Sequence, residues 1–200
     1  MSVVENGIAI IGEGLTEWYY FDSVRTANRF QFKVAPSFPS HSDITCILHL
    51  AQRYINSQYD YVICLIDMDR LNNVKAEMDI YRRKNKILKK GKLTKVMFIE
   101  TNPCTEFWFL LHFMPTLSTR VYRSCDDLLL ELRKYMPGYE KTKHYFRNIK
   151  LYEFLKENGD LKKAMTYSER LCELSKESPQ DEHSYSEIYK VFQLLATLKQ

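Results

Sequence analysis

The sequence predicts an α/β fold in which a mostly parallel sheet is flanked by helices. Between Gly7 and Met114, short apolar runs alternate with segments whose apolar residues recur at helical spacing. Such alternation is typical of parallel sheets with right-handed crossovers. The run Tyr61–Ile66 is apolar on both alternating faces, as expected for a strand buried at the centre of a parallel sheet. We therefore expect the first half of the chain to form the sheet and its covering helices.

Strands and helices can be assigned in order along this half. The predicted strands are short apolar runs bounded by turn residues, namely Gly7–Gly12, Gln31–Ala35, Tyr61–Ile66 and Lys95–Ile99. The predicted helices are Trp18–Arg29, Asp43–Ser57, Asn73–Lys90 and Cys104–Met114. Thr16 and Asp43 are residue types that cap helix N-termini, so each is expected to cap the helix it begins. Glu100–Pro103 is expected to turn the chain after the last strand.

The second half is predicted to be helical. No strand is expected after Ile99, and Ser184 is a candidate cap for the last helix. The predicted helices are Asp126–Tyr135, Lys150–Asn158, Leu161–Ser175 and Tyr185–Lys199. We expect residues 1–118 to form an α/β catalytic core and residues 119–200 a helical extension that packs on this core as one structural unit.

Composition favours a globular protein outside the membrane. The chain has 200 residues, of which 45% are hydrophobic and 14% aromatic. The apolar run Phe107–Met114 is far shorter than the roughly 20 residues that a membrane span needs. The N-terminus lacks the pattern of a secretory signal, so a cytoplasmic location is expected.

The five cysteines are scattered along the chain. They are odd in number and no two fall at CxxC spacing, which argues against a disulfide framework and against a zinc site. We expect five reduced thiols, several of them buried. The cysteines are Cys46, Cys64, Cys104, Cys125 and Cys172.

The net charge of +4 permits nucleic-acid binding without requiring it. The segment Arg82–Lys92 holds seven cations and no anion. A solvated helix end is the simplest interpretation. The functional interpretation is a phosphate-contacting patch, in which each cation releases counterions from the nucleic acid. The residues expected to make these contacts are Arg82, Arg83, Lys84, Lys86, Lys89 and Lys90.

Asp67 and Asp69 directly follow the predicted central strand. Ligands of open parallel sheets bind beyond the carboxyl ends of the strands, so both carboxylates are expected at such a mouth. Paired carboxylates repel each other unless a cation lies between them, and their hard oxygens suit Mg²⁺ or Mn²⁺. The alternative is two surface acids, one of which caps a helix.

Glu13 also follows a strand, and it lies between Gly12 and Gly14. Glycines on both sides let the backbone approach a ligand closely. Glu17, four residues later, falls in the first turn of the next helix, where an acid also favours the helix dipole. Together with the two aspartates, these acids place up to four carboxylates at the ends of two strands, as a phosphoryl-transfer metal site requires.

Glu106 is a third candidate at the same edge, on the first turn of an apolar helix that follows a strand. The alternative is again an acid that favours the helix dipole. Trp108, two residues later, is expected in the core.

These segments together resemble the RloB-like family. The resemblance rests on Gly12–Glu17, Asp67–Asp69, Asn102–Trp108 with Leu110–Phe113, Tyr139–Lys141 and Asp181–Ser184. It spans nearly the whole chain in the right order and is specific as a set. Family members often carry an aromatic residue where this chain has Thr105.

The resemblance implies a Toprim-like fold, as in topoisomerases, bacterial primases and OLD-family nucleases. Its residues, carried over by position, make Glu13, Asp67 and Asp69 catalytic. The implied cofactor is Mg²⁺ or Mn²⁺, held by Glu13, Asp67, Asp69 and, as in OLD-like members, Glu17. Glu106 and Lys141 are additional candidates, with Lys141 contacting a phosphate.

The resulting hypothesis is a metal-dependent endonuclease that hydrolyses phosphodiester bonds in DNA or RNA, with tRNA among the candidate substrates. By the same resemblance it acts in phage defence with an ATPase partner. Strand passage and primer synthesis are rival chemistries, but the tyrosine and zinc modules that they need are not evident. A module that binds metal and regulates an ATPase without cutting is the rival from another class. The sequence does not fix the oligomeric state, although the aromatic-rich C-terminal helices could form a homodimer interface.

Overall fold

A computed structural model describes residues 7–36, 43–88, 95–179 and 182–198. Its strands form one sheet in the order β2-β1-β3-β4-β5. The first four are mutually parallel, and β5 pairs antiparallel with β4. The strands are β1 (Ile8–Ile11), β2 (Lys33–Ala35), β3 (Tyr61–Asp67), β4 (Lys95–Asn102) and β5 (Tyr185–Ser186). The predicted α/β fold with a mostly parallel sheet is confirmed, and β3 is its middle strand.

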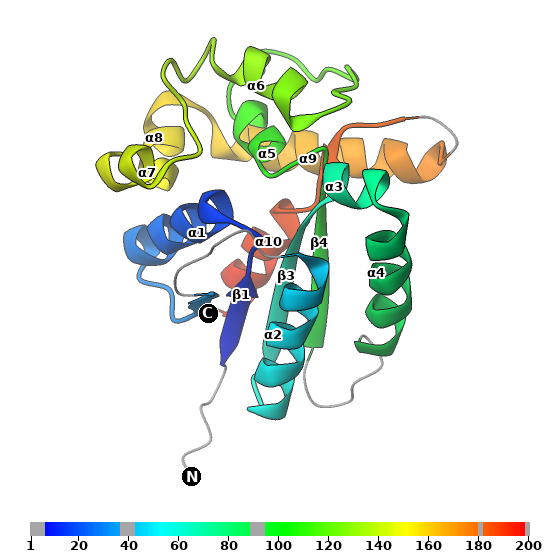
Figure 1. Cartoon of the computed structure of the whole chain (residues 1–200). Coiled ribbons are helices and arrows are strands. Elements are labelled where there is room, and N and C mark those ends of the chain that lie inside the picture. The colour runs from blue at the N-terminus through cyan, green and yellow to red at the C-terminus, as the bar shows by residue number, and fades with distance from the viewer. Residues whose placement is uncertain (1–6, 37–42, 89–94, 180–181, 199–200) are drawn as a thin grey trace.

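Helices cover both faces of the sheet (Figure 1). The side chains of β3 alternate between the two faces: Ile63 and Leu65 join one buried cluster, while Val62 and Ile66 join another. Residues of α1 (Leu15–Asn28) and α10 (Tyr189–Leu198) belong to the first cluster. Residues of α2 (Ile44–Asn56) and α4 (Lys75–Leu88) belong to the second. The sheet is therefore the middle layer of three.

The remaining helices lie beyond the carboxyl ends of the parallel strands (Figure 1). They are α3 (Met68–Asn73), α5 (Glu106–Leu111), α6 (Cys125–Leu132), α7 (Lys143–Asn148), α8 (Leu151–Asn158) and α9 (Leu161–Glu177). Every residue of α5 is buried, because it packs against both α6 and α9. A helix that is apolar nearly all round must be enclosed in this way. Trp108, on this helix, lies in the core as predicted.

Helix caps follow the sequence in one case and not in another. Asp43 caps α2 as predicted, and its side chain accepts a hydrogen bond from the Cys46 N–H at 2.8 Å. Thr16 does not cap α1, because the helix already begins at Leu15 with Gly14 as its N-cap residue. The Thr16 hydroxyl donates instead to Glu106, on another element.

The prediction of no strand after Ile99 is wrong. β4 continues to Asn102 where a turn was expected, and the two residues of β5 extend the sheet beside it. The Ser184 hydroxyl accepts the Tyr122 N–H and does not cap the last helix, which begins only at Tyr189. The short helix α7 was not predicted. The second half is otherwise helical, and a division of the chain at residue 118 stays a prediction.

No helix in the part of the chain that the structure describes is both long enough and apolar enough to cross a membrane.

Candidate functional site

The predicted catalytic acids meet at the carboxyl edge of the sheet. Asp67 ends β3, and Glu13 follows β1, the neighbouring strand. The Asp67 N–H donates to Glu13 Oε1 at 3.3 Å. Glu13 thus links the ends of β1 and β3, which are neighbouring strands as expected.

Thr105 fixes the Asp67 carboxylate. Its N–H and its hydroxyl both donate to Asp67 Oδ1, each at 2.9 Å. Two donors on one oxygen hold the carboxylate in a single orientation and leave Oδ2 for a ligand. The role of Thr105 could not be anticipated from the sequence, because it depends on β3 and β4 being adjacent.

Asp69 lies one residue into α3, on the same edge. Its Oδ1 accepts the Arg70 N–H at 2.6 Å. The Asp69 N–H donates to the Pro103 carbonyl at 2.9 Å. The bond to Pro103 joins α3 to the loop after β4.

Glu17 is buried below these residues, with 3% of its surface exposed. Its Oε2 accepts the Gly14 N–H at 2.7 Å. Its Cβ would lie 2.4 Å from a Cβ placed on Gly12, which is far inside van der Waals contact. Gly12 is therefore required by the close approach of Glu17.

Glu106 is fully buried at the start of α5 and has three partners. Its Oε1 accepts the Thr16 hydroxyl at 3.0 Å and the Tyr139 hydroxyl at 2.8 Å. The Lys141 ammonium forms an ion pair with the same oxygen at 3.0 Å. The structure thus joins the two additional candidates, Glu106 and Lys141, in one contact. Thr16 and Tyr139 lie in segments that carry the resemblance, but the sequence did not indicate their bonds to Glu106.

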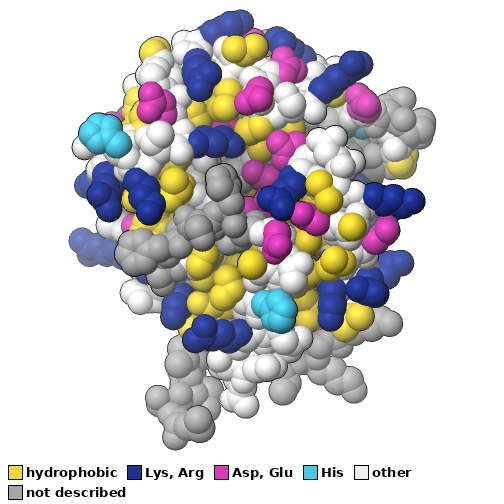
Figure 2. Space-filling view, in the orientation of Figure 1, with side chains coloured by type: hydrophobic (Ala, Val, Ile, Leu, Met, Phe, Trp, Pro, Cys, Tyr) yellow, Lys and Arg dark blue, Asp and Glu magenta, His cyan; other side chains and the backbone are white. Residues whose placement is uncertain are grey.

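The five carboxylates form two layers. Glu13, Asp67 and Asp69 are partly exposed, whereas Glu17 and Glu106 are buried behind them. In the space-filling view, Asp and Glu side chains are visible in a hollow near the middle of the molecule, with Lys and Arg side chains around it (Figure 2). Only the outer layer can contact a ligand and still reach the solvent.

This concentration of acids raises several pKa values. Burial, and next the Glu17 carboxylate, raise the pKa of Glu13 to about 8. Burial, followed by Glu17 and Glu13, raises the pKa of Asp67 well above its ordinary value. Burial also raises the pKa values of Glu17 and Asp69. Protons therefore offset part of the negative charge when no cation is present.

Lys141 is held in its charged form. Burial alone would lower its pKa, but the carboxylates of Glu106 and Asp67 outweigh burial, and the pKa is raised. An ammonium group therefore faces the acids at neutral pH.

The outer acids suit a hard divalent cation. Mg²⁺ prefers carboxylate oxygens and usually keeps several waters, with one or two protein carboxylates and a substrate phosphate completing its shell. Glu13, Asp67 and Asp69 do not need to form a closed cage for this purpose. Among the described residues, Cys104, Glu106 and Cys125 form a group whose possible metal-ligand atoms all lie within 4.8 Å of one another.

Cys104 and Cys125 form a disulfide, so the prediction of five reduced thiols is wrong for these two. Their Cα atoms are 5.7 Å apart, because α5 packs against α6. The Cys125 Sγ lies 3.1 Å from Lys141 Nζ, beside the acids. With their sulfurs bonded to each other, the two residues offer no thiolate to a metal. Cys46, Cys64 and Cys172 are free.

The described part of the basic segment, up to Leu88, lies away from the acids. Arg82, Arg83, Lys84 and Lys86 are exposed near the C-terminal end of α4. Figure 1 shows that α4 starts near α3 and runs away from the carboxyl edge, so these cations lie at the far end of the helix. Lys89 and Lys90 lie outside the described residues. Contact with nucleic acid stays a prediction for this segment.

The model of one protein family, described as RloB-like protein, matches residues 8–195 of the chain. No curated protein and no solved structure matches it.

Proposed function

The chain belongs to the RloB-like protein family, and on this basis we propose that it is a metal-dependent nuclease that hydrolyses phosphodiester bonds. The observation that carries the proposal is the convergence of five carboxylates at one edge of the sheet, three of them accessible. Carboxylates at the ends of adjacent parallel strands are what a phosphoryl-transfer site requires. The acids of the inner layer hold this arrangement in place.

Mg²⁺ or Mn²⁺ would be held by Asp67 Oδ2, Asp69 and Glu13. Bound there, the cation would polarise the scissile phosphate and lower the pKa of the attacking water. Glu17 and Glu106 position the outer acids: Glu17 packs on Gly12, and Glu106 holds Lys141. We therefore propose that Glu17 supports the site and does not contact the metal directly.

Glu13 is proposed as the residue that accepts a proton. In the metal-free site, burial and the neighbouring Glu17 raise its pKa to about 8, so Glu13 holds a proton more readily than an exposed carboxylate does. Its Oε1 accepts the Asp67 N–H, so Oε2 remains either to hold the cation or to meet the water. Lys141, whose side chain is 43% exposed, would stabilise the negative charge that grows on the phosphate.

The wider setting belongs to the same proposal. It comprises a cytoplasmic location, a role in phage defence and an ATPase partner, all expected from the family resemblance. The substrate would be DNA or RNA.

The first test is cleavage of labelled plasmid DNA, single-stranded DNA and total tRNA with Mg²⁺ or Mn²⁺. Asp67→Asn keeps an acceptor for Thr105 but removes the charge, and we expect it to lose at least about 100-fold in rate. This estimate follows from the 10–100-fold that loss of an outer-sphere partner already costs a metal site. Asp79→Asn is the matched control, because Asp79 is exposed on α4 away from the acids.

Two results would contradict the proposal. Equal cleavage by wild type and Asp67→Asn would place the activity elsewhere. The absence of cleavage by wild type, with Mn²⁺ binding retained in calorimetry and lost in Asp67→Asn, would identify a metal-binding module that cuts nothing.

A further inference from the structure

We infer that a pocket beside Asp69 binds one unpaired nucleotide, so that the substrate must present an unpaired base next to the cleaved phosphate. This inference rests on the proposed function and specifies its substrate class.

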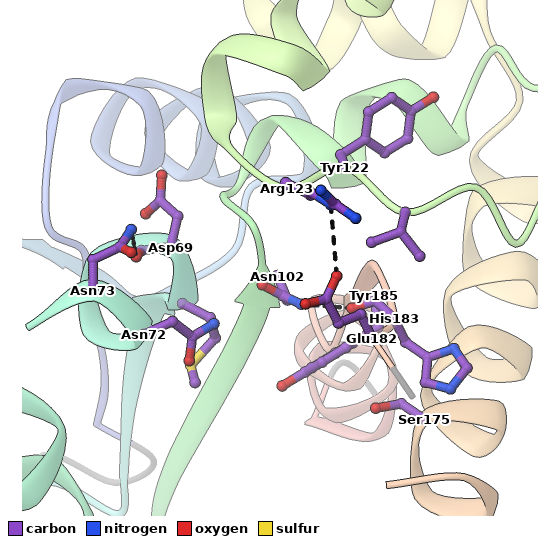
Figure 3. Close-up of a pocket in the computed structure, with 12 residues that line it drawn as sticks. Asp69, Asn72, Asn73, Asn102, Tyr122, Arg123, Ser175, Glu182, His183 and Tyr185 are labelled. Carbon is purple, nitrogen blue, oxygen red and sulfur yellow. Dashed lines mark hydrogen bonds and ion pairs between the residues drawn. The ribbon is translucent and has the colours of Figure 1, made fainter. Parts of the chain in front are cut away.

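The pocket adjoins the acids and has the size of a nucleotide. Its volume is about 400 Å³, within the range of small-molecule sites. One wall comes from α3, with Asp69, Asn72 and Asn73, and the opposite wall includes Tyr122 and Arg123 (Figure 3). A base within a duplex is stacked and paired, so it would have to leave the helix to enter such a pocket. A single strand needs no such step.

Two amides in the pocket are fixed in advance. The Asn73 side-chain amide donates to the Asp69 carbonyl at 2.8 Å, and that of Asn102 donates to the His183 carbonyl at 2.5 Å. These bonds engage the NH₂ groups, and each side chain retains its carbonyl oxygen as an acceptor. Asn72, exposed on α3, adds a third amide. Side-chain amides pair with the edges of bases, and acceptor oxygens match the exocyclic amino groups of adenine, cytosine and guanine.

Arg123 is placed to hold the backbone of the same nucleotide. Its side chain is 86% exposed and pairs with Glu182, which is 74% exposed, at 3.8 Å (Figure 3). An exposed ion pair of this length contributes little to stability, so a phosphate can replace the Glu182 carboxylate. Arginine forms strong, two-pronged hydrogen bonds with phosphate. With a base in the pocket, one phosphate would meet Arg123 and the next would lie near Asp69.

The test measures binding and does not depend on cleavage. The full chain carrying Asp67→Asn is titrated with a labelled single-stranded oligonucleotide, with the same sequence as a duplex, and with a mononucleotide as competitor, all in Mg²⁺. We expect the single strand to bind at least about tenfold more tightly than the duplex, because a duplex must first unstack and unpair a base, which costs a few kcal/mol.

Two variants test whether the preference for the single strand comes from the pocket. Asn72→Leu replaces a pocket amide with an apolar side chain at an exposed helix position, and Arg123→Ala removes the phosphate contact. Each should reduce the single-strand preference to below about twofold, whereas Asn56→Leu, at an exposed site on α2, should retain it. Circular dichroism on each variant establishes that the fold is intact.

Equal binding of single strand and duplex would overturn the inference, as would an unchanged preference in Asn72→Leu. Tight mononucleotide binding without a strand preference would assign the pocket to a free nucleotide and overturn it as well. Cleavage of duplex and single strand at equal rates by wild type would leave the nuclease proposal standing and remove this inference alone. A preference for the single strand without any cleavage would remove the nuclease proposal and leave the pocket as a single-strand binding site.

Discussion

Lys141 Nζ and Glu106 Oε1 lie 3.0 Å apart, although Glu106 has no exposed surface and the Lys141 side chain is 43% exposed. The ammonium group comes from the segment between α6 and α7, and the carboxylate comes from the first turn of α5. This contact joins the second half of the chain to the acids at the sheet edge. It neutralises a charge that the interior could not otherwise hold.

Removing the lysine should therefore destabilise the fold as well as the site. We expect Lys141→Met to lower the free energy of unfolding by about 1–2 kcal/mol, because Glu106 keeps two hydroxyl donors but loses its counter-charge. Lys141→Arg should retain most of the stability. Urea denaturation measures both, with Lys143→Met as the exposed control. Equal midpoints for Lys141→Met and Lys143→Met would show that the ion pair contributes nothing.

Gly12 and Gly14 form a matched pair for testing the approach of Glu17. A Cβ on Gly12 would lie 2.4 Å from Glu17 Cβ, whereas a Cβ on Gly14 would lie 3.4 Å from Glu17 Oε2, an ordinary contact. We expect Gly12→Ala to cost about 1–3 kcal/mol of stability through overpacking. Gly14→Ala should cost less than about 1 kcal/mol, as a cap substitution. Thermal unfolding measures both losses of stability. Equal losses for the two variants would contradict the close approach of Glu17 to Gly12.

The sequence was sufficient for the positions of the outer acids. Asp67, Asp69 and Glu13 follow apolar runs, and parallel strands bring such residues to one edge. Contacts between segments that are far apart in the sequence cannot be predicted from such local patterns. β5 is two residues long and exists because it pairs with Thr101 and Asn102. The roles of Thr105 and Tyr139 likewise require neighbours from other elements. Arg82, Arg83, Lys84 and Lys86 lie toward the far end of α4 because of the direction of that helix, which no charge pattern reveals.

The acids should make metal-free stability depend on pH. The pKa of Glu13 is raised from 4.5 in the unfolded chain to about 8 in the folded one, so the folded state binds more protons between these values. The free energy of unfolding should therefore fall as pH rises from about 4.5 to 8. Asp67, whose pKa is raised in the same direction, adds to this trend.

A bound cation should oppose this fall in the free energy of unfolding, because it takes the place of the protons on the acids. Adding Mn²⁺ should raise the unfolding midpoint more at pH 8 than at pH 5.5. Calorimetric scans at both values, with and without metal, measure this difference. In Asp67→Asn the metal-dependent rise should shrink at both values. A metal effect that is the same at both pH values would argue against binding at these acids.

The Cys104–Cys125 disulfide is the feature most sensitive to the cellular setting. In a reducing cytoplasm such bonds are opened by dithiols, which supply the two electrons that convert the disulfide to two thiols. Opening it would remove the covalent link at the start of α6, where the Cys125 Sγ lies 3.1 Å from Lys141 Nζ beside the acids. We expect dithiothreitol to lower the free energy of unfolding by about 2–3 kcal/mol, as for a loop of this size. Cys104→Ser with Cys125→Ser should start at the lower value and show no response to the reductant. Mass spectrometry after thiol alkylation reports whether the bond is present. If the purified protein carries five alkylated cysteines without reduction and its stability does not respond to dithiothreitol, the two sulfurs are not joined in solution.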